Sequence, residues 1–140
     1  MSQNSEDIDL TDPDGFQHWV EENIRFADTD AGGHINHTSM AVYVESGRTD
    51  LLLSAMSRRS SDERWLIAHI ELDYLAEAQH PGKVRIGTRL LRLGTKSVTF
   101  GAGLFLDGRC FATGQSVMVF MRGPNTAPIP EDMREVLING

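Results

Sequence analysis

The feature that most constrains this chain is a single long segment in which apolar residues recur at helical spacing. Over residues 36–57 the steps are three and four residues, whereas the flanking segments alternate with a period of two. The stripe consists of Met40, Tyr43, Val44, Gly47, Leu51 and Ala55. This spacing predicts one long helix with a buried face. Asn36 or Thr38 can cap its start by accepting hydrogen bonds from free backbone N–H groups.

The rest of the chain has the pattern of antiparallel strands. Turn signals such as HPGK at 80–83 and DG at 107–108 separate segments rich in alternating apolar residues. The predicted strands cover residues 18–26, 65–78, 84–93, 98–106 and 110–121, and a short helix covers 130–138. Close backbone approach or bending is predicted at Gly47, Gly87, Gly101, Gly103 and Gly114. We therefore predict an α+β fold in which a curved antiparallel sheet of about five strands wraps around one long helix.

Length and composition predict the domain organisation. A chain of 140 residues can bury one core, so we expect a single domain over residues 18–140. Residues 1–17 are acidic and polar, unlike a secretory signal, and predict a flexible arm. No apolar run is long enough to cross a bilayer. The single cysteine, Cys110, cannot form an internal disulfide, so we expect a cytoplasmic protein.

The net charge of −7 restricts the possible partners. General nucleic-acid binding needs a basic surface, so this charge argues against it. An anionic small ligand is still compatible with the sequence, because a few local arginines or lysines and a helix N-terminus can bind one.

The segment DTDAGGHINH, residues 28–37, joins the first strand to the long helix. Gly32 and Gly33 permit backbone angles closed to other residues, so the chain can turn sharply and leave N–H groups accessible. The helix that follows presents unpaired N–H groups and the positive end of its dipole. The carboxylate of Asp30 would face whatever these donors bind. A carbonyl group polarised by helix N–H donors beside a carboxylate, which activates water or attacks directly, is the outline of an acyl-transfer site.

Two other interpretations fit the same loop. Asp, Gly and Asn are common before helices as turn and cap residues, so Asp28 and Asp30 can be solvated loop acids. A metal site is a third possibility, because Asp28, Asp30, His34 and His37 are suitable types of ligand. The loop lacks a recognised ligand spacing such as H-E-x-x-H, which disfavours a metal.

Residues 24–52, IRFADTDAGGHINHTSMAVYVESGRTDLL, resemble the signature of the 4-hydroxybenzoyl-CoA thioesterase-like family of the hotdog-fold superfamily. Downstream, residues 70–100 resemble the family's strand, turn, strand and KS-aromatic run. The similarity covers residues 20–121, and its first half is the specific part. It implies a sheet wrapped around a helix, homodimers or tetramers with active sites at the subunit interface, and hydrolysis of acyl-CoA or acyl-carrier-protein thioesters without metal or cofactor.

The resemblance also implies roles for individual residues. Asp30 falls on the acid that serves as nucleophile or general base, and His37 falls where a backbone N–H polarises the thioester carbonyl. The segment GHIN resembles an HVNN subgroup, in which His34 and Asn36 line the acyl pocket, position water or only brace the turn. The implied substrate-binding residues are Gly33, Glu45, Thr95, Lys96 and Ser97. Glu45 is alternatively part of a structural ion-pair cluster with Arg48 and Arg25, since Arg48 follows it at helical spacing.

Two other functions are compatible with the sequence. One is a hotdog module that binds acyl-CoA without cleaving it, against which the acid at Asp30 argues. The other is a hotdog hydratase or dehydratase, which typically uses an acid and a histidine at a spacing that Asp30 and His34 do not clearly supply.

Overall fold

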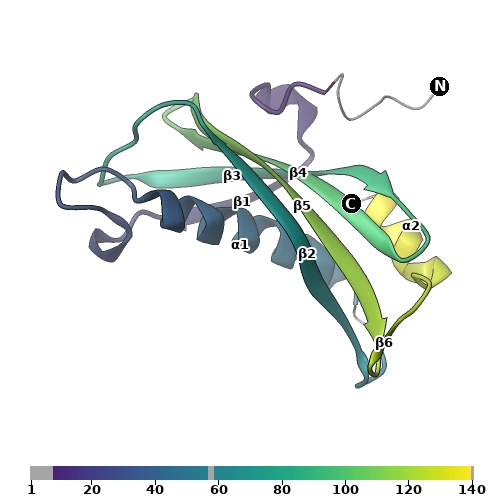
Figure 1. The fold of residues 1–140 in the computed structure, drawn as a ribbon. Coiled ribbons are helices and arrows are strands. Elements are labelled where there is room, and N and C mark those ends of the chain that lie inside the picture. Colours follow the sequence, from purple (N-terminus) through teal and green to yellow (C-terminus); the bar gives the residue numbers. More distant parts are fainter. Residues whose placement is uncertain (1–7, 57–58, 140) are drawn as a thin grey trace.

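The computed structural model describes residues 8–56 and 59–139, and these residues form two α-helices and six strands (Figure 1). The strands are β1 (His18–Asn23), β2 (Glu63–Tyr74), β3 (Lys83–Leu93), β4 (Ser97–Leu106), β5 (Arg109–Arg122) and β6 (Asn125–Thr126). The helices are α1 (His37–Ala55) and α2 (Glu131–Asn139), with 3-10 turns η2 (Pro13–Gly15) and η3 (Phe26–Asp28). The first strand ends before its predicted limit of residue 26 because the chain turns into η3.

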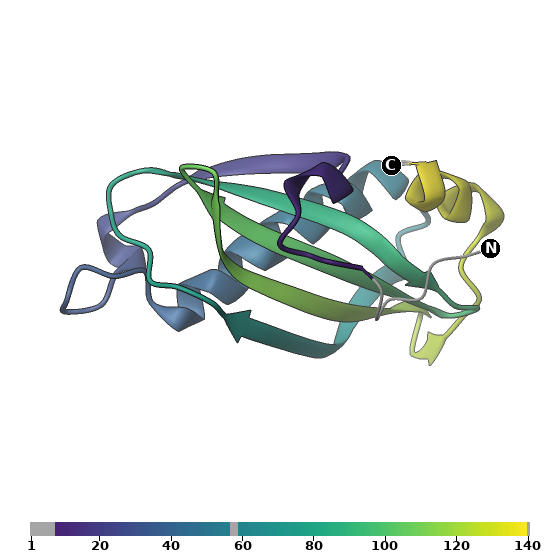
Figure 2. The same ribbon diagram turned by 90° about the horizontal axis from the view of Figure 1, so that it is seen from above.

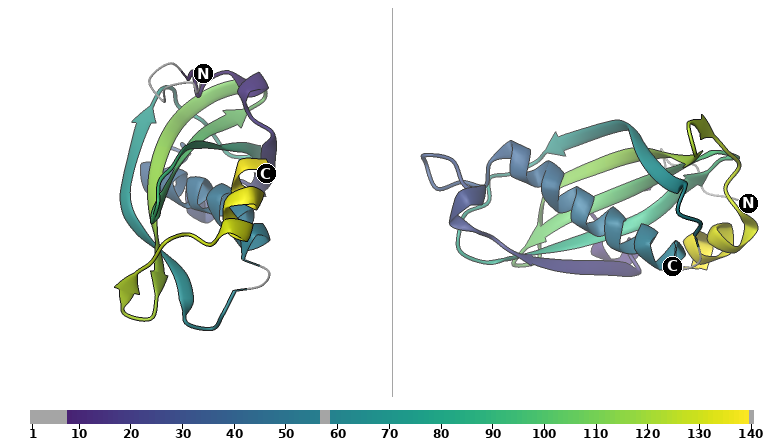
Figure 3. Two further views of the ribbon diagram at one scale, coloured as in Figure 1. Left: turned by 90° about the vertical axis from the view of Figure 1, so that its right-hand side faces the viewer. Right: turned by 90° about the horizontal axis from the view of Figure 1, so that it is seen from below.

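The strands form one antiparallel sheet in the order β1-β3-β4-β5-β2, with β6 paired to β5. The sheet curves around α1, which lies along its concave face, as the two views of Figure 3 show. This architecture confirms the predicted α+β fold with a curved sheet wrapped around one long helix. Neither α-helix of the described residues is both long and apolar enough to cross a membrane.

Helix α1 begins and packs as its sequence pattern predicts. Asn36 is the N-cap, and its side-chain oxygen accepts a hydrogen bond from the amide of Thr38 at 3.3 Å. A side chain at Gly47 would overlap Thr88 and Ile86 of β3, so the glycine is needed where the helix approaches the sheet. The helix ends at Ala55, and residue 57 of the predicted helix lies outside the described residues.

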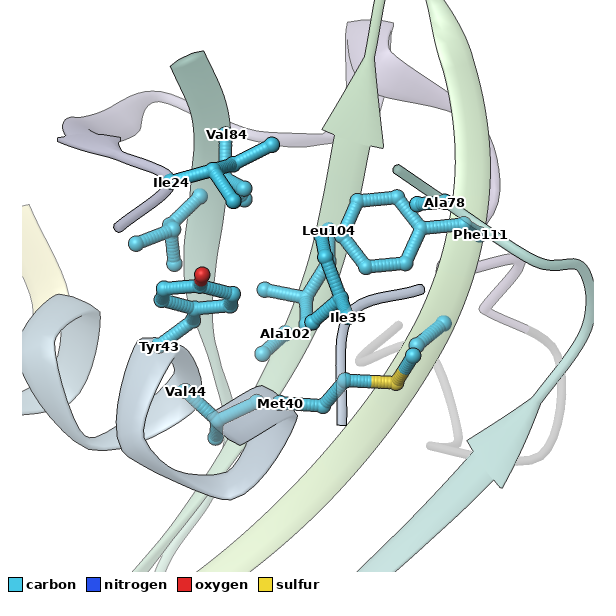
Figure 4. Packing of buried hydrophobic residues seen from close by; sticks show 12 residues of the cluster. Ile24, Ile35, Met40, Tyr43, Val44, Ala78, Val84, Ala102, Leu104 and Phe111 are labelled. Atoms are coloured by element: carbon cyan, nitrogen blue, oxygen red, sulfur yellow. The ribbon is translucent and has the colours of Figure 1, made fainter. Parts of the chain in front are cut away.

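The core lies between α1 and the sheet in two main clusters. One cluster surrounds the first half of α1, where Tyr43 and Val44 pack against Leu104 and Phe111 (Figure 4). The other surrounds the second half, where Leu51 and Leu52 meet residues of β4, β5 and α2. Full burial of each such side chain contributes about 1.5–3 kcal/mol. The first cluster therefore holds the first half of α1 against the sheet.

The N-terminal arm differs from its prediction. Residues 1–7 lie outside the described residues, but residues 8–17 lie across the convex face of the sheet (Figure 2). Phe16 is 5% exposed and occupies the space that a side chain at Gly87 would need. A side chain at Gly101 would meet the Leu10 side chain, and one at Gly103 would meet the Leu10 carbonyl oxygen and the Phe16 ring. Glycines on neighbouring strands thus leave room for this part of the arm to pack against the sheet.

Candidate active site

The loop between β1 and α1 holds two aspartates with different surroundings, and the first of them is Asp28. Its carboxylate is buried and accepts hydrogen bonds from the backbone and side chain of Arg25, at 2.9 Å, and from the hydroxyl of Tyr43, at 2.8 Å. Burial raises the pKa of Asp28, but these hydrogen bonds and the Arg25 charge outweigh it and hold that pKa below its usual range. Burial and the neighbouring Asp28 in turn raise the pKa of Tyr43.

Asp28 also anchors the loop through its backbone. Its carbonyl oxygen accepts hydrogen bonds from the amide of Asn36, at 2.8 Å, and from the hydroxyl of Ser39, at 3.0 Å. The two ends of the loop are therefore joined at one residue, just before the helix starts. The interpretation of Asp28 as a solvated loop acid is wrong, since its side chain is the buried anchor of the loop.

Asp30 lies two residues further on and faces outward. Its Oδ1 accepts hydrogen bonds from the amides of Gly32, at 2.9 Å, and His34, at 3.1 Å. The side chain is 47% exposed, and no described residue donates to Oδ2. One carboxylate oxygen is thus held by the backbone while the other is free. The loop thus orients the Asp30 side chain and leaves Oδ2 without a donor among the described residues.

The predicted accessible amides belong to the helix rather than to the glycines. Gly32 donates to the Asp30 side chain and Gly33 donates to the Asp30 carbonyl, at 3.0 Å, so neither amide is free. Gly33 has φ of +80°, and its contribution is the turn itself. The amides of residues 38–40 all donate to Asn36, but none of the described residues accepts a hydrogen bond from the amide of His37. That amide is the bare donor at the start of α1.

A cleft of about 410 Å³ brings these features together. Its lining comprises Asp30, His34, Ile35, His37, Met40, Tyr74, Leu75, Ala76 and Glu77. The lining combines the polar residues Asp30, His34 and Glu77 with the apolar or aromatic residues Met40, Tyr74 and Leu75. The ring of Tyr74 packs edge-on against His37, with centroids 6.1 Å apart. The cleft offers a charged group, a bare amide and an apolar surface within one space, which is what an acyl-transfer site needs.

The loop after β2 supplies part of this cleft, and the sequence interpretation missed it. His34 and Gln79 form an isolated β-bridge, and the amide of Ile35 donates to the carbonyl of Ala78 at 2.7 Å. The bridge carries Glu77 to within 3.3 Å of His34. Since these residues are about forty positions apart, only the three-dimensional fold brings them together. The sole sequence signal was Tyr74, an aromatic residue within the strand predicted over residues 65–78.

The predicted substrate-binding residues outside the loop do not line this cleft. Glu45 is exposed on α1, roughly 12 Å along the helix from His37, and pairs with Arg48 at 3.8 Å. The Glu45–Arg48 pair agrees with the ion-pair alternative, whereas Arg25 pairs with Asp28 instead.

Thr95, Lys96 and Ser97 lie at the turn between β3 and β4, at the opposite end of α1 from Asp30 (Figure 1). The helix between these two ends is roughly 28 Å long. Within one chain, this turn therefore cannot contact a group bound beside Asp30.

The four residues considered as metal ligands do not converge. The Asp28 carboxylate points toward Arg25 and Tyr43, away from the cleft that contains Asp30, His34 and His37. In the part of the chain that the structure describes, no group of three or more His, Cys, Asp or Glu residues is placed to hold a metal ion.

Comparisons with known proteins show the family of this chain. A family model described as the thioesterase-like superfamily matches residues 24–137. The uncharacterized protein YsmA of Bacillus subtilis is 29% identical over 107 residues, which are 74% of this chain and 72% of that protein.

Two solved structures share the fold and part of the sequence. A thioesterase from Thermus thermophilus, complexed with coenzyme A and Zn, aligns with a TM-score of 0.79 and 29% identity, over 88% of this chain and 98% of that one. A predicted thioesterase from Bacillus stearothermophilus aligns with a TM-score of 0.76 and 30% identity, over 86% of this chain and 92% of that one. The family match includes the loop with Asp30 and all of α1.

Proposed function

We propose that this chain, which belongs to the thioesterase-like superfamily, hydrolyses the thioester bond of an acyl-CoA or acyl-carrier-protein substrate. The observation that carries the proposal is that Asp30, with one free carboxylate oxygen, and His37, whose amide donates to none of the described residues, line the same cleft at the start of α1. A pure binding module has no need for an ionised acid beside the reactive carbonyl. The GHIN segment supports placement in the HVNN subgroup of the family.

In the proposed mechanism the substrate carbonyl lies against the first turn of α1. The amide of His37 donates a hydrogen bond to the carbonyl oxygen, and the positive end of the helix dipole stabilises the charge that develops there. Asp30 then activates a water molecule or attacks the carbonyl carbon itself. Asn36 caps the helix and so keeps the His37 amide in place. His34 lies beside Asp30 in the cleft.

The apolar residues of the cleft support an acyl substrate. Met40 is buried beneath the cleft, while Tyr74 and Leu75 are 53% and 50% exposed at its rim. An acyl group or the pantetheine arm can cover these side chains. Coenzyme A is bound in the aligned Thermus thermophilus thioesterase, which favours acyl-CoA as the first substrate to test.

A homodimer is part of the proposal, because β2 leaves one edge of the sheet open. Among the described residues this strand pairs with β5 alone, and its large exposed apolar residues are Leu66, Ile67, Ile70 and Tyr74. Unpaired edges of this kind readily add a strand from another chain. Pairing with a second copy would bury the apolar side chains and remove the edge.

Antiparallel pairing of two β2 strands would also complete the site. It lays the Tyr74 end of one strand beside the Glu63 end of the other. The turn with Lys96 lies near the Glu63 end, because Phe120 donates to the Lys96 carbonyl and pairs with Trp65. Lys96 of the partner subunit would thus reach the cleft and can bind an anionic group of the substrate. This arrangement reconciles the predicted role of Thr95–Ser97 with their distance from Asp30 in one chain.

The test is a panel of acyl-CoA and acyl-carrier-protein thioesters of increasing chain length, with detection of free thiol. We expect thiol release from at least one substrate. Thermal stabilisation by acyl-CoA without thiol release would instead indicate a binding module. A hydrated or unsaturated thioester as product would indicate a hydratase or dehydratase.

A further inference from the structure

The imidazole of His34 lies between two carboxylates. Its Nε2 is 3.3 Å from Oε2 of Glu77, and its Nδ1 is 3.8 Å from Oδ1 of Asp30. The ring is 31% exposed, and all three side chains line the same cleft. One imidazole therefore connects the acid expected to activate water with a second acid from the loop after β2.

The backbone already holds these loops together without the Glu77 side chain. The bridge between His34 and Gln79 joins them, and Arg109 donates to the carbonyl of Glu77 at 2.6 Å. The Glu77 carboxylate is 79% exposed, and ion pairs at exposed positions contribute only about 0–1 kcal/mol to stability. The contact of this carboxylate with His34 therefore contributes little to the stability of the fold. A role in the cleft explains the contact better.

We propose that His34 gives a proton to the departing thiolate and is then reprotonated by Asp30, and that Glu77 is a positioning residue that orients the His34 ring. This inference rests on the proposed thioester hydrolysis. An alkyl thiol has an ordinary pKa of about 8.5, so its thiolate must gain a proton at neutral pH. Imidazole is suited to that transfer because it can both accept and donate a proton near neutrality.

The steps balance as follows. Asp30 takes a proton from water as the water oxygen bonds to the carbonyl carbon, and the carbonyl electron pair moves onto the oxygen held by the His37 amide. That pair returns, the carbon–sulfur bond breaks, and sulfur leaves with the bonding electrons. Protonated His34 gives its proton to sulfur and then takes the proton held by Asp30. The carboxylic acid product loses its own proton to solvent.

The experiment compares two leaving groups on the same acyl group. One substrate is an acyl-CoA, and the other is the acyl ester of a nitrothiophenol, whose thiolate is stable at neutral pH and needs no proton. We expect His34→Gln to lower kcat on acyl-CoA by about 100-fold, the usual effect of a general acid, and to leave the aryl thioester nearly unchanged. Glu77→Gln should lower kcat on acyl-CoA by less, with the same selectivity.

The matched control is Glu21→Gln. Glu21 lies on β1, outside the cleft, and forms a similar exposed pair with Arg85 at 3.9 Å. It should change neither rate.

Equal losses on both substrates would overturn the relay, since they indicate a structural effect, and so would unchanged rates on both. Failure of the wild-type protein to hydrolyse either substrate would overturn the thioesterase proposal as well. Circular dichroism of each variant identifies any loss of fold, and Glu77→Gln then decides the outcome if His34→Gln does not fold.

Discussion

Asp28 and Asp30 are two residues apart in one loop, yet the fold treats them in opposite ways. Asp28 is 3% exposed and uses its side chain and its carbonyl oxygen to tie the loop to Arg25, Tyr43 and the start of α1. Asp30 has a half-exposed side chain with one oxygen held by two amides and the other free. A carboxylate with both oxygens hydrogen-bonded, as in Asp28, thus stabilises the loop, whereas a carboxylate with one free oxygen, as in Asp30, is available for chemistry.

This contrast separates stability from activity at neighbouring positions. Removing a buried acid that has all its hydrogen-bond partners lowers the stability of the protein, because the donors left behind have no acceptor. A half-exposed acid on a backbone turn costs little to replace by its amide. Substitutions at the two positions should therefore affect different measurements.

The largest expected effect is on catalysis at Asp30. Asp30→Asn should lower kcat for the best acyl-CoA substrate by about 10²- to 10⁴-fold, because the amide cannot accept the proton of water. The melting temperature should stay nearly unchanged, since the amide oxygen can still accept from Gly32 and His34. Asp14→Asn, at an exposed aspartate of η2 outside the cleft, is the control. Retained activity would place the chemistry at another residue.

The next effect is on folding at Asp28. Asp28→Ala should lower the free energy of unfolding by about 3 kcal/mol, because Tyr43 and the Arg25 amide lose their buried acceptor. Urea unfolding of this variant and of Asp14→Ala, at the exposed aspartate of η2, measures the difference. Equal stabilities of the two variants would mean that Asp28 is not the anchor of the loop.

A smaller change is expected when only one hydrogen bond of this anchor is removed. Tyr43→Phe deletes the hydroxyl that donates to Asp28 and keeps the buried ring, so the free energy of unfolding should fall by about 1 kcal/mol. The same urea titration measures it. A loss as large as that of Asp28→Ala would show that the Tyr43 hydrogen bond accounts for the whole contribution of Asp28, and no loss would show that packing of the ring, rather than the hydrogen bond, holds the loop.

The smallest effect is a dependence of stability on acidic pH. The pKa of Asp28 is lower in the folded protein than the ordinary value of 3.8, so the unfolded chain binds the proton first as pH falls. The stabilisation from Asp28 is therefore complete above that value and is lost as pH falls through the lower, folded pKa. Unfolding free energies of the wild type and Asp28→Asn from pH 5 to pH 2 should converge at the acid end. Parallel curves would contradict the assignment.

Local spacing was enough to predict the fold. The stripe from Met40 to Ala55 defined α1, and period-two segments with turn signals defined the sheet. Gly47 was also interpreted correctly, because a glycine inside a good helix indicates close approach to a neighbour. The packing of Leu10 and Phe16 was not foreseen, since it depends on glycines of β3 and β4 that become neighbours only in the sheet.

The candidate site was predicted only where it is local in sequence. Asp30, Asn36 and His37 lie within eight residues of one another, so the sequence alone was enough to predict that the loop acid and the helix start lie close together. Glu77 and Tyr74 reach the cleft through a bridge between distant loops, which no local pattern reports. The different surroundings of Asp28 and Asp30 were not predicted either. They depend on the hydrogen bond between Asp28 and Tyr43, which lies more than one turn into α1.

The most direct test of the central claim is a crystal structure with an acyl-CoA analogue in which a methylene group precedes the sulfur, so that the carbonyl remains but cannot be cleaved. We expect the carbonyl oxygen about 2.7–3.1 Å from the amide nitrogen of His37, with the free Oδ2 of Asp30 facing the carbonyl carbon directly or through one water. A carbonyl bound away from α1, or an Asp30 side chain turned out of the cleft, would contradict the account.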